Sequence, residues 1–454
     1  MDRLPAELIL SIGQLIEKHT LCSLIRCCRR LYDVLQPLLY TKIRLVSPLS
    51  DSYISLVMRM WRYPEIARHV RHAEMHLPII RHHRPQPLPQ LDETKVPGLQ
   101  AFIQDVQSEM FDLKDKRRRD WWGKGLRGSE WCFWLGVLLV RLTRLESIEF
   151  IGLYNNSAIC DLLYRAAKQQ RPFHEEPPYP LLRQIAVRDC EQGFELEEVL
   201  TPFFYLPAVE SVDISQLWDG RGRDDPLEWR REASCARCPV KEIVIRSLKH
   251  SRGTLTWLAD CTDLERISVR IPCIFVGYPE IRFGVPFNPA RFIRNLLPFR
   301  RTLKSLHIEY DQVYHALLNA PGPLELYYED IYWLTEDERN LDHCNAPVDS
   351  LRDFEVLEEV SLRHANLLPA VDGASARGIL ADRLPKPLRR LCILNIVESR
   401  YTDLLTELTI LVTTARDTFP NLNQIQLPRN TVDEMSLPAF QHDCTNAGVS
   451  FEYF

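Results

Sequence analysis

The sequence predicts an α/β protein with a short helical segment, residues 1–45, followed by an irregular array of stacked strand-and-helix repeats over residues 46–454. Three observations predict this fold class. Apolar residues recur with a period of about 3.6 in the first segment, which is typical of amphipathic helices. A pattern of the form apolar-x-x-apolar-x-apolar recurs through the second segment. Glycine is scarce, with 17 residues, whereas 31 prolines gather near segment boundaries, as expected for many short elements.

The composition excludes several classes of protein. Of the 454 residues, 26% are charged and 45% are hydrophobic, so most of the chain should fold. The net charge of −5 gives no general attraction to nucleic acid or anionic membranes, although local basic patches remain possible. No apolar run reaches the roughly 18–20 residues of a membrane span, and no secretory leader is recognisable. Many of the 13 cysteines lie in apolar stretches, which is typical of free thiols in a reducing compartment. We therefore expect a cytoplasmic or nuclear protein.

The N-terminal segment predicts two helices. The first begins at Pro5, whose ring suits a first helical turn, and Gly13 weakens it by about 1 kcal/mol relative to alanine. The second begins near Thr20, a residue type favoured as an N-cap, and Pro37 ends or kinks it. The apolar stripes are Leu4, Leu8, Ile9, Ile12, Leu15 and Ile16 in the first helix, and Leu21, Leu24, Ile25, Cys28, Leu31, Tyr32 and Leu35 in the second.

Two such short helices do not bury enough surface to be stable alone. They either dock on the rest of the chain or complete their core on another protein. Six apolar anchors buried in a partner would contribute a gross stabilisation of roughly 9–18 kcal/mol, at about 1.5–3 kcal/mol for each side chain. The association itself costs about 4–15 kcal/mol. A stable complex is therefore energetically allowed.

The stretches "LPAELILSIGQLI" and "LCSLIRCCRRLYDVLQPLLYTKIRL" resemble an F-box. In that family, Leu-Pro-x-Glu is followed by apolar residues at helical spacing, by a Cys-Arg pair and by a terminal Leu-Tyr. One departure is at Leu31 and Tyr32, where many F-boxes have a tryptophan. The matching positions are Leu4, Pro5, Glu7, Leu8, Ile9, Ile12, Leu24, Cys28, Arg29 and Tyr40.

The resemblance implies that residues 1–45 bind a Skp-type adaptor, which links F-box proteins to a cullin and a RING protein. The alternative is a helical cap that packs only on the rest of this chain. The residues expected to contact the adaptor are Leu4, Pro5, Leu8, Ile9, Ile12, Leu24 and Cys28.

The recurring pattern in residues 46–454 predicts a series of short strands. The last two apolar positions of each triplet are two residues apart, so they face the same side of a strand. Segments with helical spacing lie between them, for example residues 288–299 and 402–419. One strand and one helix cannot bury their own apolar faces, but stacked neighbours can. The triplets are Val70/Ala73/Met75, Leu145/Ile148/Phe150, Leu182/Ile185/Val187, Val209/Val212/Ile214, Val240/Ile243/Ile245, Leu264/Ile267/Val269, Leu303/Leu306/Ile308, Leu357/Val360/Leu362, Leu388/Leu391/Ile393 and Leu422/Ile425/Leu427.

This array resembles an irregular leucine-rich repeat of the kind often found behind an F-box. Several intervals, such as Leu303 to Leu357, exceed the roughly 20–29 residues of a typical repeat. The Asn or Cys that the family has after its strand is clear only at Cys190. The alternative is a generic α/β or mixed domain.

The long intervals predict insertions at residues 78–141, 218–234 and 313–353. Residues 78–97 are rich in proline and predict a loop. In repeat proteins, insertions project from one edge and often build the binding surface. The third insertion combines acidic residues with Tyr327, Tyr328, Tyr332 and Trp333. Such a loop suits protein recognition, or it packs on itself and covers the edge of the array. The substrate-binding residues remain unknown.

Two groups of residues have the types and spacing of metal ligands. Cys235 and Cys238 are spaced as zinc ligands are, but a second pair is missing, and Cys238 precedes a strand triplet where burial explains it. His72 and His76 would suit zinc on a helix, but they fall on a predicted strand. We therefore predict no metal site and no cofactor.

Two further stretches have chemical potential. Residues 114–119 (KDKRRR), followed by Trp121 and Trp122, could be a nuclear-localisation or phosphate-binding patch, or a solvated helix or loop face. His343 and Cys344 have the residue types of a nucleophile pair, but no orienting scaffold is visible. No glycine-rich phosphate loop or nucleophile elbow occurs. We therefore predict no catalytic residues.

Together these observations favour the substrate-recognition subunit of a Skp–cullin–F-box ubiquitin ligase. Residues 46–454 would hold an unidentified protein substrate, and so raise the effective concentration of its lysine at the ubiquitin carrier. Neither nucleic acid nor membrane is an expected partner. Replacing Ile9 with aspartate is expected to abolish adaptor binding. The alternatives are an adaptor-bound scaffold protein without a ubiquitin-ligase role, and a metal-dependent enzyme that uses the Cys and His residues.

Overall fold

The structure is a computed structural model of the whole chain. It divides into two compact units: unit 1 holds residues 1–192, 198–212 and 227–239, and unit 2 holds residues 193–197, 213–226 and 240–454. The residues that it describes are 4–46, 50–77, 90–91, 93–94, 96–128, 130–152, 157–188, 201–218, 238–249, 258, 261–272, 287–312, 342–369, 378–429 and 437–454. Most of the predicted insertion 218–234, residues 313–341 of the third insertion, Cys190 and Cys235 lie outside these ranges.

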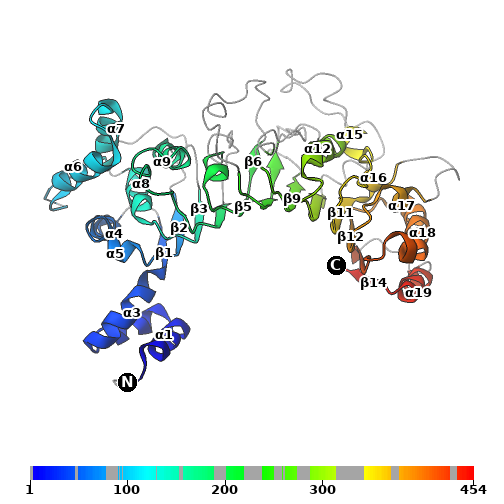
Figure 1. Cartoon of the computed structure of the whole chain (residues 1–454), viewed down its shortest axis with the longest axis horizontal. Coiled ribbons are helices and arrows are strands. Elements are labelled where there is room, and N and C mark those ends of the chain that lie inside the picture. The colour runs from blue at the N-terminus through cyan, green and yellow to red at the C-terminus, as the bar shows by residue number, and fades with distance from the viewer. Residues whose placement is uncertain are drawn as a thin grey trace, which may run out of the picture. The chain divides into compact units, whose positions relative to one another are not determined.

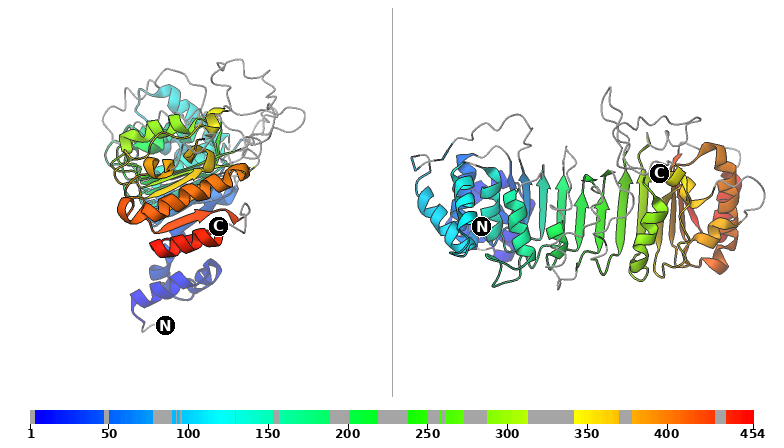
Figure 2. Two further views of the ribbon diagram at one scale, coloured as in Figure 1. Left: turned by 90° about the vertical axis from the view of Figure 1, so that its right-hand side faces the viewer. Right: turned by 90° about the horizontal axis from the view of Figure 1, so that it is seen from above.

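The described strands confirm the predicted α/β class. Twelve of them form one parallel sheet whose spatial order follows the chain order, and β6 (Leu217–Trp218) and β8 (Leu248–Lys249) form a separate pair. Figure 2 shows these strands as neighbouring arrows. The strands of the large sheet are β1 (Lys42–Leu45), β2 (His72–His76), β3 (Ser147–Ile151), β4 (Gln184–Arg188), β5 (Ser211–Ile214), β7 (Glu242–Ile245), β9 (Arg266–Ile271), β10 (Ser305–Tyr310), β11 (Glu359–Arg363), β12 (Arg390–Leu394), β13 (Gln424–Leu427) and β14 (Ser450–Tyr453).

Each of the ten predicted triplets contains a strand. In β3, Ile148 and Phe150 are buried while the alternate positions, Ser147, Glu149 and Ile151, are partly exposed, as the two-residue period requires. Parallel register stacks equivalent positions, so Ile148 lies beside Ala73 of β2 and Ile185 of β4. The apolar positions therefore form continuous buried rows within the units, and the intervening positions form a second, polar face.

Helices bury the apolar face of the strands. In unit 1, α8 and α9 cover one face of β2 and β3 (Figure 1). The unit 1 helices after the N-terminal segment are α4 (Asp51–Arg62), α5 (Pro64–Ala67), α6 (Leu99–Met110), α7 (Lys116–Arg127), α8 (Trp131–Arg141), α9 (Ser157–Ala167) and the 3-10 helix η1 (Thr201–Tyr205). Those of unit 2 are α12 (Pro289–Leu296), η3 (Leu297–Phe299), α15 (Asp342–Asn345), α16 (His364–Leu367), α17 (Ile379–Arg383), η5 (Glu398–Arg400), α18 (Tyr401–Thr418) and α19 (Leu437–Ala447).

The sequence pattern predicted two of the helices of unit 2, whereas three helices of unit 1 lie where an insertion was predicted. The predicted helical segments 288–299 and 402–419 correspond to α12 and α18. Within the predicted insertion 78–141, the structure places α6, α7 and α8. Residues 131–140 of α8 are nearly all buried, because this helix is apolar on every side and packs against α4, α7 and α9. No helix among the described residues is both long enough and apolar enough to cross a bilayer.

Charges of alternating sign mark the entry to successive strands. Each such residue follows the first apolar position of a triplet. Within each unit, the backbone N–H of every member after the first donates to the carbonyl of the preceding one, as Arg183 does to Glu146 at 2.9 Å. We call this row the alternating ladder; it consists of Arg71, Glu146, Arg183 and Glu210 in unit 1, and of Lys241, Glu265, Lys304, Glu358 and Arg389 in unit 2. Ion pairs join Arg71 to Glu146 at 3.4 Å, Arg183 to Glu210 at 2.6 Å, Lys304 to Glu265 at 2.8 Å and Arg389 to Glu358 at 3.5 Å.

The N-terminal segment forms three helices, not the two that were predicted. They are α1 (Ala6–Leu15), α2 (Lys18–Leu24) and α3 (Arg29–Thr41). The predicted second helix is interrupted because Cys28 adopts an extended conformation, with φ −158° and ψ 160°. Pro37 lies inside α3 and does not end it. Gly13 allows α1 to pack closely against α3, since an added Cβ would lie 2.5 Å from Leu35 and 2.7 Å from Leu38 of α3.

Candidate functional site

The three N-terminal helices enclose a small apolar core of their own. Ile9 of α1 packs there with side chains of α2 and α3. The fully buried members are Ile9, Leu21, Leu31 and Leu35, and the partly buried ones are Leu4, Ile16, Leu24, Ile25, Cys28, Val34, Leu38 and Leu39. Only one side of α1 is needed for this core.

The other side of α1 exposes a row of large apolar side chains, which we call the docking stripe. Leu8 is 51% exposed, Ile12 is 40% exposed and Leu15 is 88% exposed. Their spacing of four and three residues places them on one face of the helix. Tyr32 of α3 is 40% exposed as well. A contiguous apolar surface of this kind on a folded protein is typical of a site for another protein.

The predicted adaptor contacts divide into three groups. Leu8, Ile12 and Pro5 are exposed, so they are available to a partner. Leu4, Leu24 and Cys28 are half-buried at the edge of the core. Ile9 is only 4% exposed and lies inside the core of the helices.

Because Ile9 lies in the core, replacing it with aspartate would not test adaptor contact alone. Aspartate at position 9 would put a charge into the core and disturb the packing of α1 before any partner is involved. Leu15, on the other hand, lies on the docking stripe although sequence reasoning did not include it among the contacts. The continued helical spacing from Leu8 and Ile12 was the signal that identifies it.

Two long basic side chains hold the N-terminal helices in place. Arg30 of α3 donates to the carbonyl of Leu4, next to the start of α1. Lys18 of α2 donates to the carbonyl of Lys42 at 2.5 Å, where β1 begins. Figure 1 shows α3 leading directly into β1. The docking stripe is therefore presented on a helix that is tied to the first strand of the sheet.

The polar face of the strands is a second candidate surface, which sequence reasoning missed. In unit 2 its side chains bond across neighbouring strands, so they present an ordered set of donors and acceptors. The contacts are Arg266 Nε to Glu242 Oε1 at 3.0 Å, Arg390 Nη1 to Glu359 Oε1 at 3.5 Å, Arg390 Nε to Gln424 Oε1 at 2.7 Å, Gln424 Nε2 to Glu452 Oε2 at 2.6 Å and Gln426 Nε2 to Glu452 Oε2 at 3.1 Å. The signal was present in the polar residues between the apolar positions of each triplet.

Cys392 of β12, which lies on the polar face, is not an activated nucleophile. Cys392 is buried between its neighbours, and this burial raises the pKa of its thiol to about 11. The thiol is therefore protonated at neutral pH. On β10, the imidazole of His307, whose Nε2 lies 3.7 Å from Glu309 Oε2, lowers the pKa of Glu309, so that this carboxylate stays charged. The face offers hydrogen bonds and charges, which suit recognition of a polar surface.

The predicted metal candidates do not come together. His72 and His76 lie on β2, where a spacing of four residues separates them by roughly 13 Å. His72 Nδ1 contacts Ser147 Oγ at 2.8 Å, and His76 Nε2 contacts Glu74 Oε1 at 2.6 Å. Within the described ranges, no three His, Cys, Asp or Glu side chains form a group that could hold a metal ion.

The cysteine candidates are buried. Cys238 and Cys344 are fully buried, and the described cysteines form no disulfide with one another. Asn366 donates to the carbonyl of Cys344 at 2.8 Å and to that of Ala346 at 3.0 Å, which satisfies backbone acceptors around α15. The surroundings of Cys344 are therefore those of a core position.

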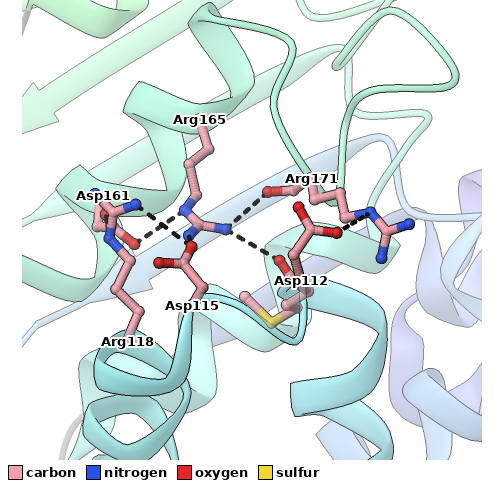
Figure 3. Close-up of polar contacts among 7 residues, drawn as sticks. Asp112, Asp115, Arg118, Asp161, Arg165 and Arg171 are labelled. Carbon is pink, nitrogen blue, oxygen red and sulfur yellow. Dashed lines mark hydrogen bonds and ion pairs between the residues drawn. The ribbon is translucent and has the colours of Figure 1, made fainter.

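A buried arginine joins three segments of unit 1. Arg165 of α9 is only 4% exposed, and its Nη1 donates to the carbonyls of Met110 at 3.0 Å and Arg171 at 2.9 Å (Figure 3). Its Nη2 lies 3.2 Å from Asp115, and its Nε lies 3.4 Å from Asp161. Burial lowers the pKa of Arg165, and the two carboxylates oppose that effect. The cluster fixes the turn that precedes α7.

Sequence comparison finds no matching family model and no matching curated protein. The geometry therefore carries the functional argument. It offers an exposed apolar stripe on α1 and a polar face on the strands. Both features suit binding to other proteins.

Proposed function

We propose that this chain is the substrate-recognition subunit of a Skp–cullin–F-box ubiquitin ligase in the cytoplasm or nucleus. The observation that carries the proposal is the docking stripe: Leu8, Ile12 and Leu15 remain exposed on a helix whose opposite side is already packed. The stripe lies within the segment that resembles an F-box. A Skp-type adaptor is the partner which that resemblance implies.

The energetics require the adaptor to cover more than the docking stripe. The exposed fractions of Leu8, Ile12 and Leu15 add to about two full side chains, so their burial contributes roughly 3–6 kcal/mol. This gain lies at the low end of the association cost of about 4–15 kcal/mol. Contacts with Pro5, Tyr32 and the half-buried edge of the core supply the remainder. The proposed interface therefore spans α1 and α3.

Residues 46–454 would act as the receptor for a protein substrate. We assign them to an irregular leucine-rich-repeat-like solenoid, because the strand order follows the chain order and most strands bury alternate residues. The polar face of the strands supplies donors and acceptors for a bound protein. The chain performs no bond chemistry in this proposal; it positions a lysine of the substrate.

Co-purification with a Skp-type adaptor tests the docking stripe. Replacing Ile12 and Leu15 together with aspartate places two charges in the interface, so adaptor capture should fall at least about tenfold. Gln14→Asp, on the polar side of α1, is the matched control and should bind normally. Circular dichroism should show that both variants fold. Full adaptor capture by the folded double variant would refute the proposal.

The same purification distinguishes the ligase role from the alternative role as an adaptor-bound scaffold. A cullin that co-purifies through the adaptor supports the ligase role. An adaptor that co-purifies without any cullin, under conditions in which a known F-box protein captures both, supports the adaptor-bound scaffold without a ubiquitin-ligase role.

A further inference from the structure

The solvent face of α7 carries four basic residues. Lys116, Arg117, Lys124 and Arg127 are exposed, and Asp120 is the acidic residue among them. Helical spacing places these five side chains on one side, opposite the buried Trp122 and Leu126. We call this side the basic face of α7. The whole chain has a net charge of −5, so the positive charge here is local.

The basic side chains of this face are not neutralised by the protein. Among the described residues, no carboxylate lies within ion-pair distance of Lys116, Arg117 or Lys124. Arg127 contacts a neutral group, the Oε1 of Gln100, at 3.2 Å. The basic residues of the alternating ladder differ, since most of them pair with an acidic neighbour.

Arg118 shows that the basic residues of the run 114–119 have two separate roles. It turns toward the buried cluster of Figure 3, where it lies 3.6 Å from Asp115 and 3.6 Å from Asp161. Its neighbours Lys116 and Arg117 point to solvent. The run therefore divides into one arginine that holds the structure and a set of cations that serve no internal contact.

The cations in the first turn of α7 are unfavourable for the helix itself. Lysine and arginine in the first turn oppose the helix dipole, which favours acidic residues there. The first turn of α7 contains no acidic residue. Lys124 and Arg127 lie in the last turn, where the dipole favours cations, so the cost falls on Lys116 and Arg117. A partner that brings negative charge would remove this penalty.

The basic face is held rigidly. On its inner side, α7 packs Trp122 against Phe133, with ring centroids 5.2 Å apart, and Gly136 of α8 approaches Trp122 so closely that a Cβ would lie 2.6 Å away. The Arg165 cluster fixes the preceding turn. Because the cations sit on an anchored helix, less order has to be gained when a ligand binds.

We propose that the basic face of α7 binds an acidic segment of another protein. The face is small and Asp120 lies among its four cations, so it suits a short acidic segment better than a continuous phosphate backbone. The apolar side of α7 is buried in unit 1, so it is not available for insertion into a bilayer. One exposed apolar residue, Leu113, is 86% exposed next to the face and offers a contact for an apolar side chain of the segment. This site does not depend on the proposed ligase role.

Fluorescence anisotropy with the full chain tests the proposal. The probe is a fluorescein-labelled peptide of alternating glutamate and serine, compared with the same peptide carrying glutamine. The wild type should bind the acidic peptide alone, and binding should weaken as salt is added. The triple variant Lys116→Gln/Arg117→Gln/Lys124→Gln should bind about 10- to 100-fold more weakly, since it lacks three charge-assisted contacts.

The control has the same net charge as the triple variant. Arg300→Gln/Arg301→Gln/Lys386→Gln removes three exposed cations from unit 2 and should change binding by less than about twofold. Equal loss in both triple variants, or no loss in the α7 variant, would overturn the proposal. So would wild-type binding to phosphatidylserine vesicles or a single-stranded oligonucleotide without binding to the acidic peptide. Adaptor capture by the α7 variant should be normal, which separates this site from the docking stripe.

Discussion

Replacing Arg165 with methionine should destabilise unit 1 by about 3–5 kcal/mol, the range expected when one partner of a buried ionic cluster is removed. Methionine fills much of the same volume and keeps contact with Phe111, whose ring lies 4.4 Å from the guanidinium. It has no donor, however, for the carbonyls of Met110 and Arg171. It also removes the charge beside Asp161.

The magnitude follows from the individual contacts. Each buried acceptor left without a partner costs about 1–3 kcal/mol. Asp161 is largely buried and loses its closest cation, whereas Asp115 is 40% exposed and recovers water. The wild type, in turn, must desolvate the guanidinium, which lowers the pKa of Arg165 and offsets part of the gain. The net loss therefore lies within the range stated above.

Chemical denaturation of the full chain, together with hydrogen exchange in α9, measures this loss. Hydrogen exchange reports on unit 1 even where the two units unfold separately. Arg171→Met is the control, because it breaks an exposed ion pair with Asp112 at 3.3 Å that should contribute less than about 1 kcal/mol. Equal stability of the two variants, or a loss below about 1 kcal/mol for Arg165→Met, would refute the reasoning.

Four further measurements test other parts of the structure. The buried carboxylate of Glu407 accepts from two backbone amides at the start of α17, so Glu407→Gln should cost about 1–3 kcal/mol in denaturation. A double-mutant cycle on Lys304 and Glu265 should give a coupling of about 0.2–1 kcal/mol. A hydrogen bond from Lys304 lowers the pKa of Glu265 below 4.5, so the difference between wild type and Glu265→Gln should be complete above that pH and vanish as the pH falls through the folded-state pKa. Gly125→Ala should destabilise unit 1, because its Cβ would lie 2.3 Å from the ring of Phe133.

The strands were predictable because their signal is local. Each triplet needs only the two-residue alternation of a strand, and Ile148 and Phe150 show it directly. β1 shows where the same rule was available and unused: Tyr40, Ile43 and Leu45 fit the triplet, but the sequence interpretation gave these residues to the helical segment. β14 breaks the pattern, since Gly448 occupies the first apolar position.

The helices of unit 1 were harder to predict for a different reason. Residues 131–140 are apolar without a polar face, so no helical period distinguishes α8 from other buried segments. In α1 the helix itself was predictable, but its buried side was not. Ile9 and Leu8 both belong to an apolar stripe that extends around the helix, and sequence alone does not say which side packs on α2 and α3. That choice depends on residues distant in sequence, as do the contacts of Arg165.

The alternating ladder offers a reason why so irregular an array keeps its strand order. Interval length cannot define the neighbours here, because the step from Leu303 to Leu357 is much longer than that from Val240 to Leu264. Within each unit, adjacent turns carry opposite charges, whereas turns two steps apart carry like charges, as Glu265 and Glu358 do. A strand that skipped its neighbour would therefore exchange an attraction for a repulsion at this edge. Each contact is weak on its own, but the preference acts at every step in the same direction, so it favours sequential stacking over the alternatives.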